Sequence, residues 1–177
     1  MTVYEYLQTP ETTLPQELVY GHLRAAEAPL VNHQRAVFAI ARALQDHVAS
    51  IGLGEVLLAP VDVILDADRH LVVQPDVLFV SAARAHIVTD RIDGAPDLVI
   101  EVLSPDPRIG QLTERVEWFA RYGVREMWLY RQPERRMEVL QCAGGRVTGR
   151  DAFEGHDAVR SAVLPRLDLS VAEIVGY

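Results

Sequence analysis

The sequence predicts an α/β fold of mixed α+β type, with a central mixed β-sheet flanked by helices. Two segments with apolar residues every three or four positions alternate with segments of period two that are rich in valine, isoleucine and leucine. The length of 177 residues suits one domain, and 49% hydrophobic and 24% charged residues are typical of a globular protein. Because Pro10 and Pro15 interrupt the start, we expect residues 1–16 to form an N-terminal arm and residues 17–177 a single domain.

The first expected elements are a pair of short strands and a long helix. Residues 17–24 are predicted as strand, glycine turn and strand. From residue 33 to residue 48 the apolar positions describe one buried helix face, and Asn32 directly before them is a plausible N-cap. A helix over 33–48 should therefore follow the hairpin.

The middle and the end of the chain alternate between strands and one further helix. Three neighbouring strands are predicted, at residues 56–65, 71–80 and 97–103. A helix over 112–122, stopped by Gly123, is followed by strands over 126–131 and 136–142. A turn at Gly144 and Gly145, a weaker strand pair and an apolar tail over 163–175 complete the chain.

The basic residues are unusual because all 17 of them are arginine, and the chain has no lysine. Any mechanism that needs a lysine amine is therefore excluded. The single cysteine, Cys142, cannot form an internal disulfide, which fits a reducing cytoplasm. The apolar runs are too short to span a bilayer and the N-terminus lacks the pattern of a secretory signal, so we expect a cytoplasmic protein without membrane partners.

The net charge of −8 argues against strong, general binding of nucleic acid, which depends on basic side chains. The charge is uneven: residues 1–100 carry 13 acidic residues and 6 arginines, and residues 101–177 carry 12 and 11. A phosphate-facing surface is thus expected from the second half. Its arginines either contact a phosphate backbone or form a solvated surface paired with nearby acids, and we favour the second alternative for residues 131, 135, 136, 146, 150 and 160.

Acidic residues on two apolar strands are the strongest functional signal. Asp76 lies within the strand predicted over 71–80 and Glu101 within the strand predicted over 97–103, where an ionised carboxylate is costly without hydrogen bonds or a metal. If the two strands are neighbours, both carboxylates can bind Mg²⁺ or Mn²⁺, which would activate water against a phosphodiester. Alternatively, Asp76 and Asp97 each follow a proline and serve as strand-entry residues, an interpretation that we favour for Asp97.

Several motifs in this order resemble the Uma family, a bacterial group assigned as restriction endonucleases of the PD-(D/E)XK superfamily. They are residues 18–21, His33, residues 75–77, residues 96–105 (Pro-Asp-Leu-Val-Ile-Glu-Val-Leu-Ser-Pro) and residues 123–128 (Gly-Val-Arg-Glu-Met-Trp). The resemblance extends from about Glu17 to the C-terminus. It implies a restriction-endonuclease-like fold, with Asp76 and Glu101 as metal ligands and Glu17 as a supporting acid.

The chain departs from the family at the basic residue. The superfamily lysine two positions after the acid is Leu103 here, and the Asp, Lys and Tyr of the alternative helix pattern are Gln111, Arg115 and Phe119. Arg115 keeps a positive charge that can stabilise a phosphate, but its pKa above about 12 prevents it from readily giving up a proton. The alternative for Arg115 is an exposed helix arginine near Glu114 or Gln111.

Two functions remain open from the sequence. The first is a Mg²⁺- or Mn²⁺-dependent DNA endonuclease, a hydrolase acting as a possible homodimer, with Asp76, Glu101 and Arg115 as catalytic residues and an altered, impaired active site. The second is a catalytically inactive nuclease-fold protein that binds nucleic acid or protein. The absent lysine, Gln111, Phe119 and the acidic charge favour the second function.

Overall fold

The computed structural model describes residues 1–177 except 11, 13, 26–27, 104–111 and 177. Ser104, Pro105 and Gln111 of the predicted motifs thus lie outside the described residues. In chain order, the elements are α1 (Val3–Leu7), β1 (Gln16–Val19), β2 (His22–Ala25), α2 (Val31–Ser50), β3 (Gly54–Leu58), β4 (Val63–Asp66), β5 (Leu71–Val73), β6 (Val77–Ser81), a 3₁₀ helix η1 (Ala82–Ile87), β7 (Ile92–Asp93), β8 (Leu98–Leu103), α3 (Leu112–Tyr122), β9 (Glu126–Arg131), β10 (Arg136–Ala143), β11 (Arg146–Glu154) and α4 (Val171–Val175).

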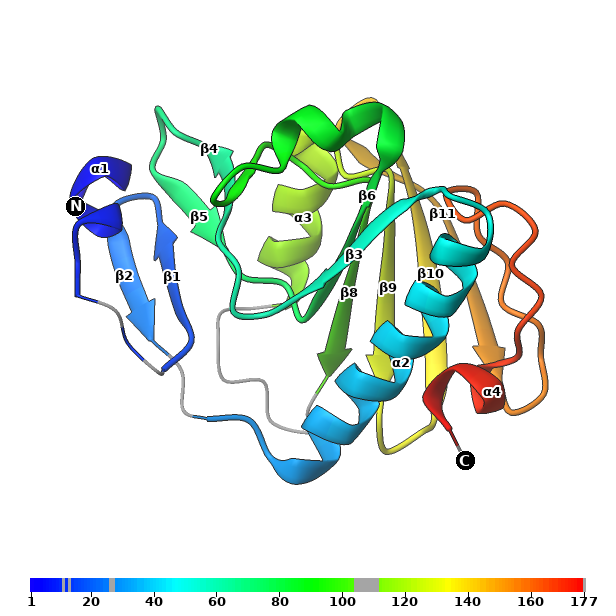
Figure 1. The fold of residues 1–177 in the computed structure, drawn as a ribbon. Helices are drawn as coiled ribbons and strands as arrows, with labels where there is room; N and C mark the ends of the chain where they lie inside the picture. The colour runs from blue at the N-terminus through cyan, green and yellow to red at the C-terminus, as the bar shows by residue number, and fades with distance from the viewer. Residues whose placement is uncertain (11, 13, 26–27, 104–111, 177) are drawn as a thin grey trace.

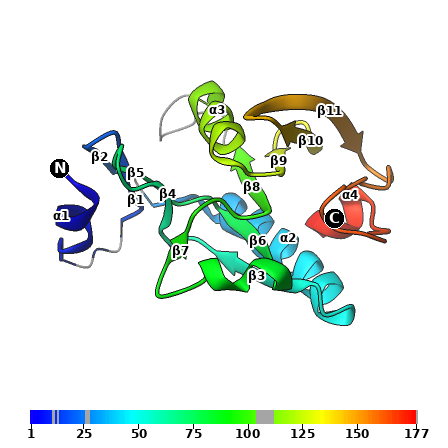
Figure 2. The ribbon, with the colours of Figure 1, turned by 90° about the horizontal axis from the view of Figure 1, so that it is seen from above.

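The strands form two sheets rather than one. The larger has the order β11-β10-β9-β8-β6-β3, and the smaller has the order β2-β1-β5-β4-β7. In the larger sheet β8 and β9 are parallel and the remaining neighbours are antiparallel, so this sheet is mixed. One core lies between this sheet, α2 and α4, and a second lies between it and α3. Figures 1 and 2 show the helices on the two faces, which confirms the predicted fold class.

The local patterns predicted most elements closely. The β1–β2 hairpin, α3, β9 and β10 lie where the sequence indicated them. The N-cap prediction for Asn32 is wrong, because α2 begins at Val31 with Leu30 as an N-cap that has no side-chain hydrogen bond. Leu30 has an extended backbone, and its carbonyl already accepts a hydrogen bond from the Gln34 amide at 3.1 Å.

Two predicted strands each divide at a proline. Residues 56–65 become β3 and β4 on either side of Pro60, and residues 71–80 become β5 and β6 on either side of Pro75. Proline has no N–H for a β-ladder, so the chain leaves one sheet at each of these positions and enters the other. Of the three strands expected to be neighbours, the parts that form β3, β6 and β8 share the larger sheet, and the parts that form β4 and β5 pair in the smaller one.

The two ends of the chain pack onto the sheets. Within the segment predicted as an arm, α1 buries Val3 and Tyr6 against Leu18 and Val72, and the Tyr6 hydroxyl donates to Asp62 Oδ1 at 2.9 Å. At the other end, the predicted strand pair is one long strand, β11, and the apolar tail ends in α4. Among the described residues, no helix combines the length and apolarity needed to cross a membrane.

Candidate active site

Strands β6 and β8 bring Asp76 and Glu101 together. The two strands are antiparallel with Val77 opposite Ile100, and continuing this register by one pair places Asp76 opposite Glu101. Directly opposite residues project their side chains from the same face of the sheet. In addition, the Val102 amide donates to Asp76 Oδ2 at 2.8 Å. The adjacency that the metal-site hypothesis requires is therefore present.

Asp76 is held by a second contact, from the first turn of α2. His33 Nε2 lies 3.2 Å from Asp76 Oδ2, and 11% of the His33 side-chain surface is exposed. Burial alone would lower the pKa of His33, but the hydrogen bond to Asp76 and the charges of Asp76 and Glu101 outweigh it and raise that pKa. His33 thus fixes the orientation of Asp76, a role that its position in the sequence did not reveal.

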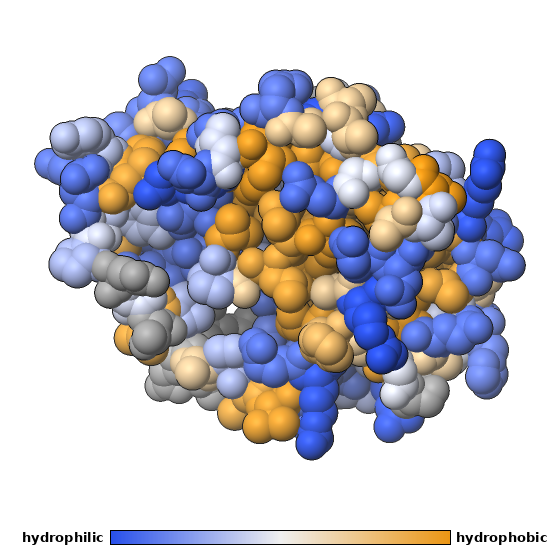
Figure 3. Space-filling model, in the orientation of Figure 1, coloured by the Kyte–Doolittle hydropathy of each residue, from blue (hydrophilic) through white to orange (hydrophobic). Residues whose placement is uncertain are grey.

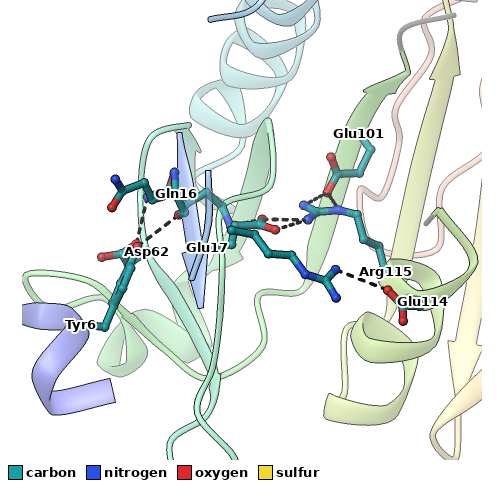
Figure 4. Close-up of polar contacts among 9 residues, drawn as sticks. Tyr6, Gln16, Glu17, Asp62, Glu101, Glu114 and Arg115 are labelled. Atoms are coloured by element: carbon teal, nitrogen blue, oxygen red, sulfur yellow. Dashed lines mark hydrogen bonds and ion pairs between the residues drawn. The ribbon is translucent and has the colours of Figure 1, made fainter. Parts of the chain in front are cut away.

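Arg115 lies between two carboxylates (Figure 4). Its Nη1 donates to both carboxylate oxygens of Glu17 at 2.7 Å, and its Nη2 and Nε donate to Glu101 Oε1 at 2.6 and 3.1 Å. The guanidinium also lies 5.5 Å from the ring centroid of Phe119. These contacts join β1, β8 and α3. With only 7% of its surface exposed, Arg115 is not the exposed helix arginine considered as an alternative.

The charges of this cluster shift the pKa values of its members. For Glu101, burial raises the pKa, Arg115 opposes the rise, and the negative charges of Asp76 and Glu17 add to it, so that the pKa is about 7. For Arg115, burial would lower the pKa, but Glu101 and Glu17 raise it further. Arg115 therefore remains charged and cannot act as a proton donor or acceptor.

Asp97 lies at the opposite end of β8 and serves the fold. It is fully buried, accepts a hydrogen bond from the Ser81 amide at 2.8 Å, and lies 3.5 and 3.4 Å from Arg84 and Arg125. This is the strand-entry role favoured for it from the sequence. Burial would raise its pKa, but the Ser81 hydrogen bonds and the two arginines lower it below the ordinary value.

Replacing Asp97 with asparagine should lower the free energy of unfolding by about 1–3 kcal/mol at pH 7, because the Ser81 amide and two arginines lose a charged partner. A carboxyl whose pKa is depressed by folding stabilises the protein above its unfolded pKa, and this stabilisation is lost as the pH falls through the folded pKa. Urea unfolding of both proteins should therefore show a difference that shrinks below about pH 4. An equal difference at every pH would contradict this assignment.

Three of the six arginines considered for a phosphate-facing surface are paired with acids. Arg131 and Arg150 contact Glu138 at 2.7 and 3.2 Å, and Arg136 lies 3.8 Å from Glu154. These pairs lie within β9, β10 and β11 on the side of the sheet away from β6. They fit the solvated, paired surface that we favoured from the sequence over a face that binds phosphate.

The chain has a mixed α+β fold of the restriction-endonuclease-like kind, with a cluster of three acids at its candidate site. A family model described as "Putative restriction endonuclease", Uma2, matches residues 3–172, and the chain belongs to this family. A crystal structure of "a putative nuclease belonging to DUF820" from Anabaena variabilis is similar over 99% of this chain and 97% of that one, with a TM-score of 0.83 and 20% identity. No curated protein matches the sequence.

Proposed function

We propose that the protein hydrolyses phosphodiester bonds of DNA with the help of a divalent cation held by Asp76 and Glu101. The observation that carries the proposal is a surplus of negative charge in a largely buried cluster. Three carboxylates, Glu17, Asp76 and Glu101, face one guanidinium, so the cluster is negative whenever all three acids are ionised, even with His33 protonated. Buried charge of this kind is costly unless a cation balances it.

The donor set fits a small, hard cation such as Mg²⁺ or Mn²⁺. Asp76 Oδ1 and Glu101 Oε2 accept no hydrogen bond from the residues that the structure describes, whereas both oxygens of Glu17 are engaged by Arg115. The described part of the chain accordingly contains no group of three or more acidic, histidine or cysteine side chains arranged for a metal. Mg²⁺ is commonly held by one or two carboxylates, with water and phosphate oxygens as its other ligands.

Each residue of the site then has a defined task. A bound cation would lower the pKa of a water molecule and stabilise negative charge on the phosphate. The Val102 amide and His33 orient Asp76, while Arg115 orients Glu101. The second N–H of Arg115 Nη2 donates to none of the described residues and is available for a phosphate oxygen. Because no lysine is present and Arg115 stays charged, proton transfer lacks its usual basic residue, and we expect slow cleavage.

As part of the same proposal, the protein acts on DNA in the cytoplasm as a homodimer, so that two centres can reach the two strands of a duplex. Membership of a family described as restriction endonucleases supports DNA as the substrate. The alternative is a protein that binds nucleic acid or another protein without catalysing a reaction. The hydrogen bonds that hold the Arg115 guanidinium between Glu17 and Glu101 favour this alternative. Metal binding and DNA cleavage separate the two.

Asp76→Asn and Glu101→Gln should each weaken Mn²⁺ binding, measured by calorimetry, by about tenfold or more and reduce cleavage of supercoiled plasmid by about 10²-fold or more, because each removes a charged ligand. Glu117→Gln is the matched control, since Glu117 is an exposed acid on α3. Cleavage that persists in both site variants would contradict the assignment of Asp76 and Glu101 as metal ligands. Wild-type protein that binds DNA but neither Mn²⁺ nor Mg²⁺, and cleaves nothing, would establish the alternative.

A further inference from the structure

The edge strand β3 differs from the other edges of the two sheets. At the far edge of the larger sheet, β11 carries Arg146, Arg150, Asp151 and Glu154, and its partner β10 is irregular at Gln141 and Cys142. In the smaller sheet, β2 carries Arg24, and β7 has two residues. Charges, irregularities and shortness protect a strand edge from pairing with another chain.

By contrast, β3 has few features that protect its edge from pairing with another chain. Its sequence, Gly-Glu-Val-Leu-Leu, contains one charge and no proline, and its register with β6 is regular. Leu58 is 42% exposed at its end, and Phe38 and Ile51 are exposed on and just after the neighbouring α2. Hydrophobic residues gather in the middle of the face in Figure 3, where Figure 1 places β3 in front of the sheet.

The free backbone groups of β3 can be assigned from its pairing with β6. The Ala82 amide donates to the Leu53 carbonyl at 2.8 Å, and the Ala59 amide donates to the Asp76 carbonyl at 3.1 Å. In an antiparallel pair, residues that point their N–H and C=O toward the partner alternate with residues that point them away. Residues 53, 55, 57 and 59 therefore bond to β6, and Gly54, Val56 and Leu58 present their N–H and C=O to the outside.

We propose that β3 pairs antiparallel with β3 of a second copy of this chain, around a twofold axis at Val56, to form a continuous twelve-stranded sheet from two six-stranded sheets. In this register, every outward-facing N–H and C=O group of β3 forms a hydrogen bond. Val56 bonds to Val56 of the partner subunit, and Gly54 bonds to Leu58 of the partner subunit. A twofold axis makes one strand sufficient for both sides of the interface. The proposal does not depend on the nuclease activity.

The side chains of β3 fit this arrangement. Val56 packs toward the core under α2 and Leu57 toward the opposite core, so Leu58 projects from the α2 face and Glu55 from the other. In the paired sheet, exposed Leu58 lies across from Gly54 of the partner subunit, which has no side chain to obstruct it. Glu55 lies across from Leu57 of the partner subunit, so that the only charge of β3 does not face its own copy. Charge and shape therefore favour a second copy over an unrelated chain.

Sedimentation of the full-length protein tests the proposal. The wild type should be a dimer at about 100 µM, and Leu58→Lys should raise its dissociation constant by at least about tenfold, because a buried leucine becomes a charge. Val56→Pro should act similarly while leaving the monomer folded, since the Val56 N–H points away from β6. Leu23→Lys on β2 is the matched control, because Leu23 is 45% exposed.

Hydrogen exchange supplies a readout at the strand itself. The Val56 and Leu58 amides should be protected in the wild-type dimer, and this protection should fall on dilution and in Leu58→Lys. A wild-type protein that remains monomeric at about 100 µM would overturn the proposal. So would a dimer whose strength is unchanged by both Leu58→Lys and Val56→Pro, because such a dimer uses another surface.

Discussion

Replacing Arg115 with methionine is expected to lower the free energy of unfolding by about 3–5 kcal/mol, because it leaves Glu17 and Glu101 buried without their counter-ion. The guanidinium makes hydrogen bonds of 2.6 to 2.7 Å to both acids, and its own surface is almost entirely covered. Folded domains are stable by only about 5–15 kcal/mol, so the variant should unfold at a much lower urea concentration.

An exposed ion pair between an arginine and a glutamate provides the comparison for this experiment. Arg24 lies 3.4 Å from Glu114, with side chains 37% and 46% exposed, and Arg24→Met should cost less than about 1 kcal/mol. Circular dichroism during urea unfolding measures both variants against the wild type. If Arg115→Met were no more destabilising than Arg24→Met, the buried ion cluster would not hold the two sheets together.

The second large effect is expected at Glu126, within the Gly-Val-Arg-Glu-Met-Trp motif. Glu126 is fully buried, and its carboxylate accepts hydrogen bonds from Trp128 Nε1 at 2.7 Å, Ser161 Oγ at 2.6 Å and the Ala162 amide at 2.7 Å. Glu126→Ala leaves these buried donors without an acceptor and should cost about 3 kcal/mol or more. Through Glu126, the motif thus anchors the segment around Ser161 to the sheet.

Two further variants make this interpretation specific. Glu126→Gln keeps the size of the side chain but turns one acceptor into a donor, so it should lose stability although it leaves no cavity. Glu117→Ala, at an exposed acid, should change the free energy of unfolding by less than about 0.5 kcal/mol. Urea unfolding again gives the measurement. A Glu126→Ala protein that retained wild-type stability would show that the three contacts contribute little.

The sequence predicted those parts of the fold that depend on local patterns. The bounds of α3 and β9 match the structure residue for residue, because a buried helix face and a hydrophobic strand leave a signal within a few residues. The division into two sheets was missed. It follows from Pro60 and Pro75, whose effect on sheet membership depends on which distant strand is available at each break.

The candidate site was partly predictable for a related reason. Asp76 and Glu101 were found because a carboxylate on an apolar strand is costly wherever the strand lies. The contact of Arg115 with Glu17 spans 98 positions in the chain, and no local spacing indicates it. The same applies to His33 and Asp76, which are 43 positions apart. The metal itself, the catalytic roles and the domain division stay predictions.

The different anchoring of the acids limits how this protein can change over time. Glu17 and Glu101 neutralise the guanidinium that links β1, β8 and α3, so a lineage that loses either acid also loses stability. Asp76 contacts a backbone amide and His33 at the margin of the cluster and is the most exposed of the three acids. Under the proposed function, a change at Asp76 removes the metal ligand while the fold persists, so Asp76 is the position that should distinguish active from inactive relatives.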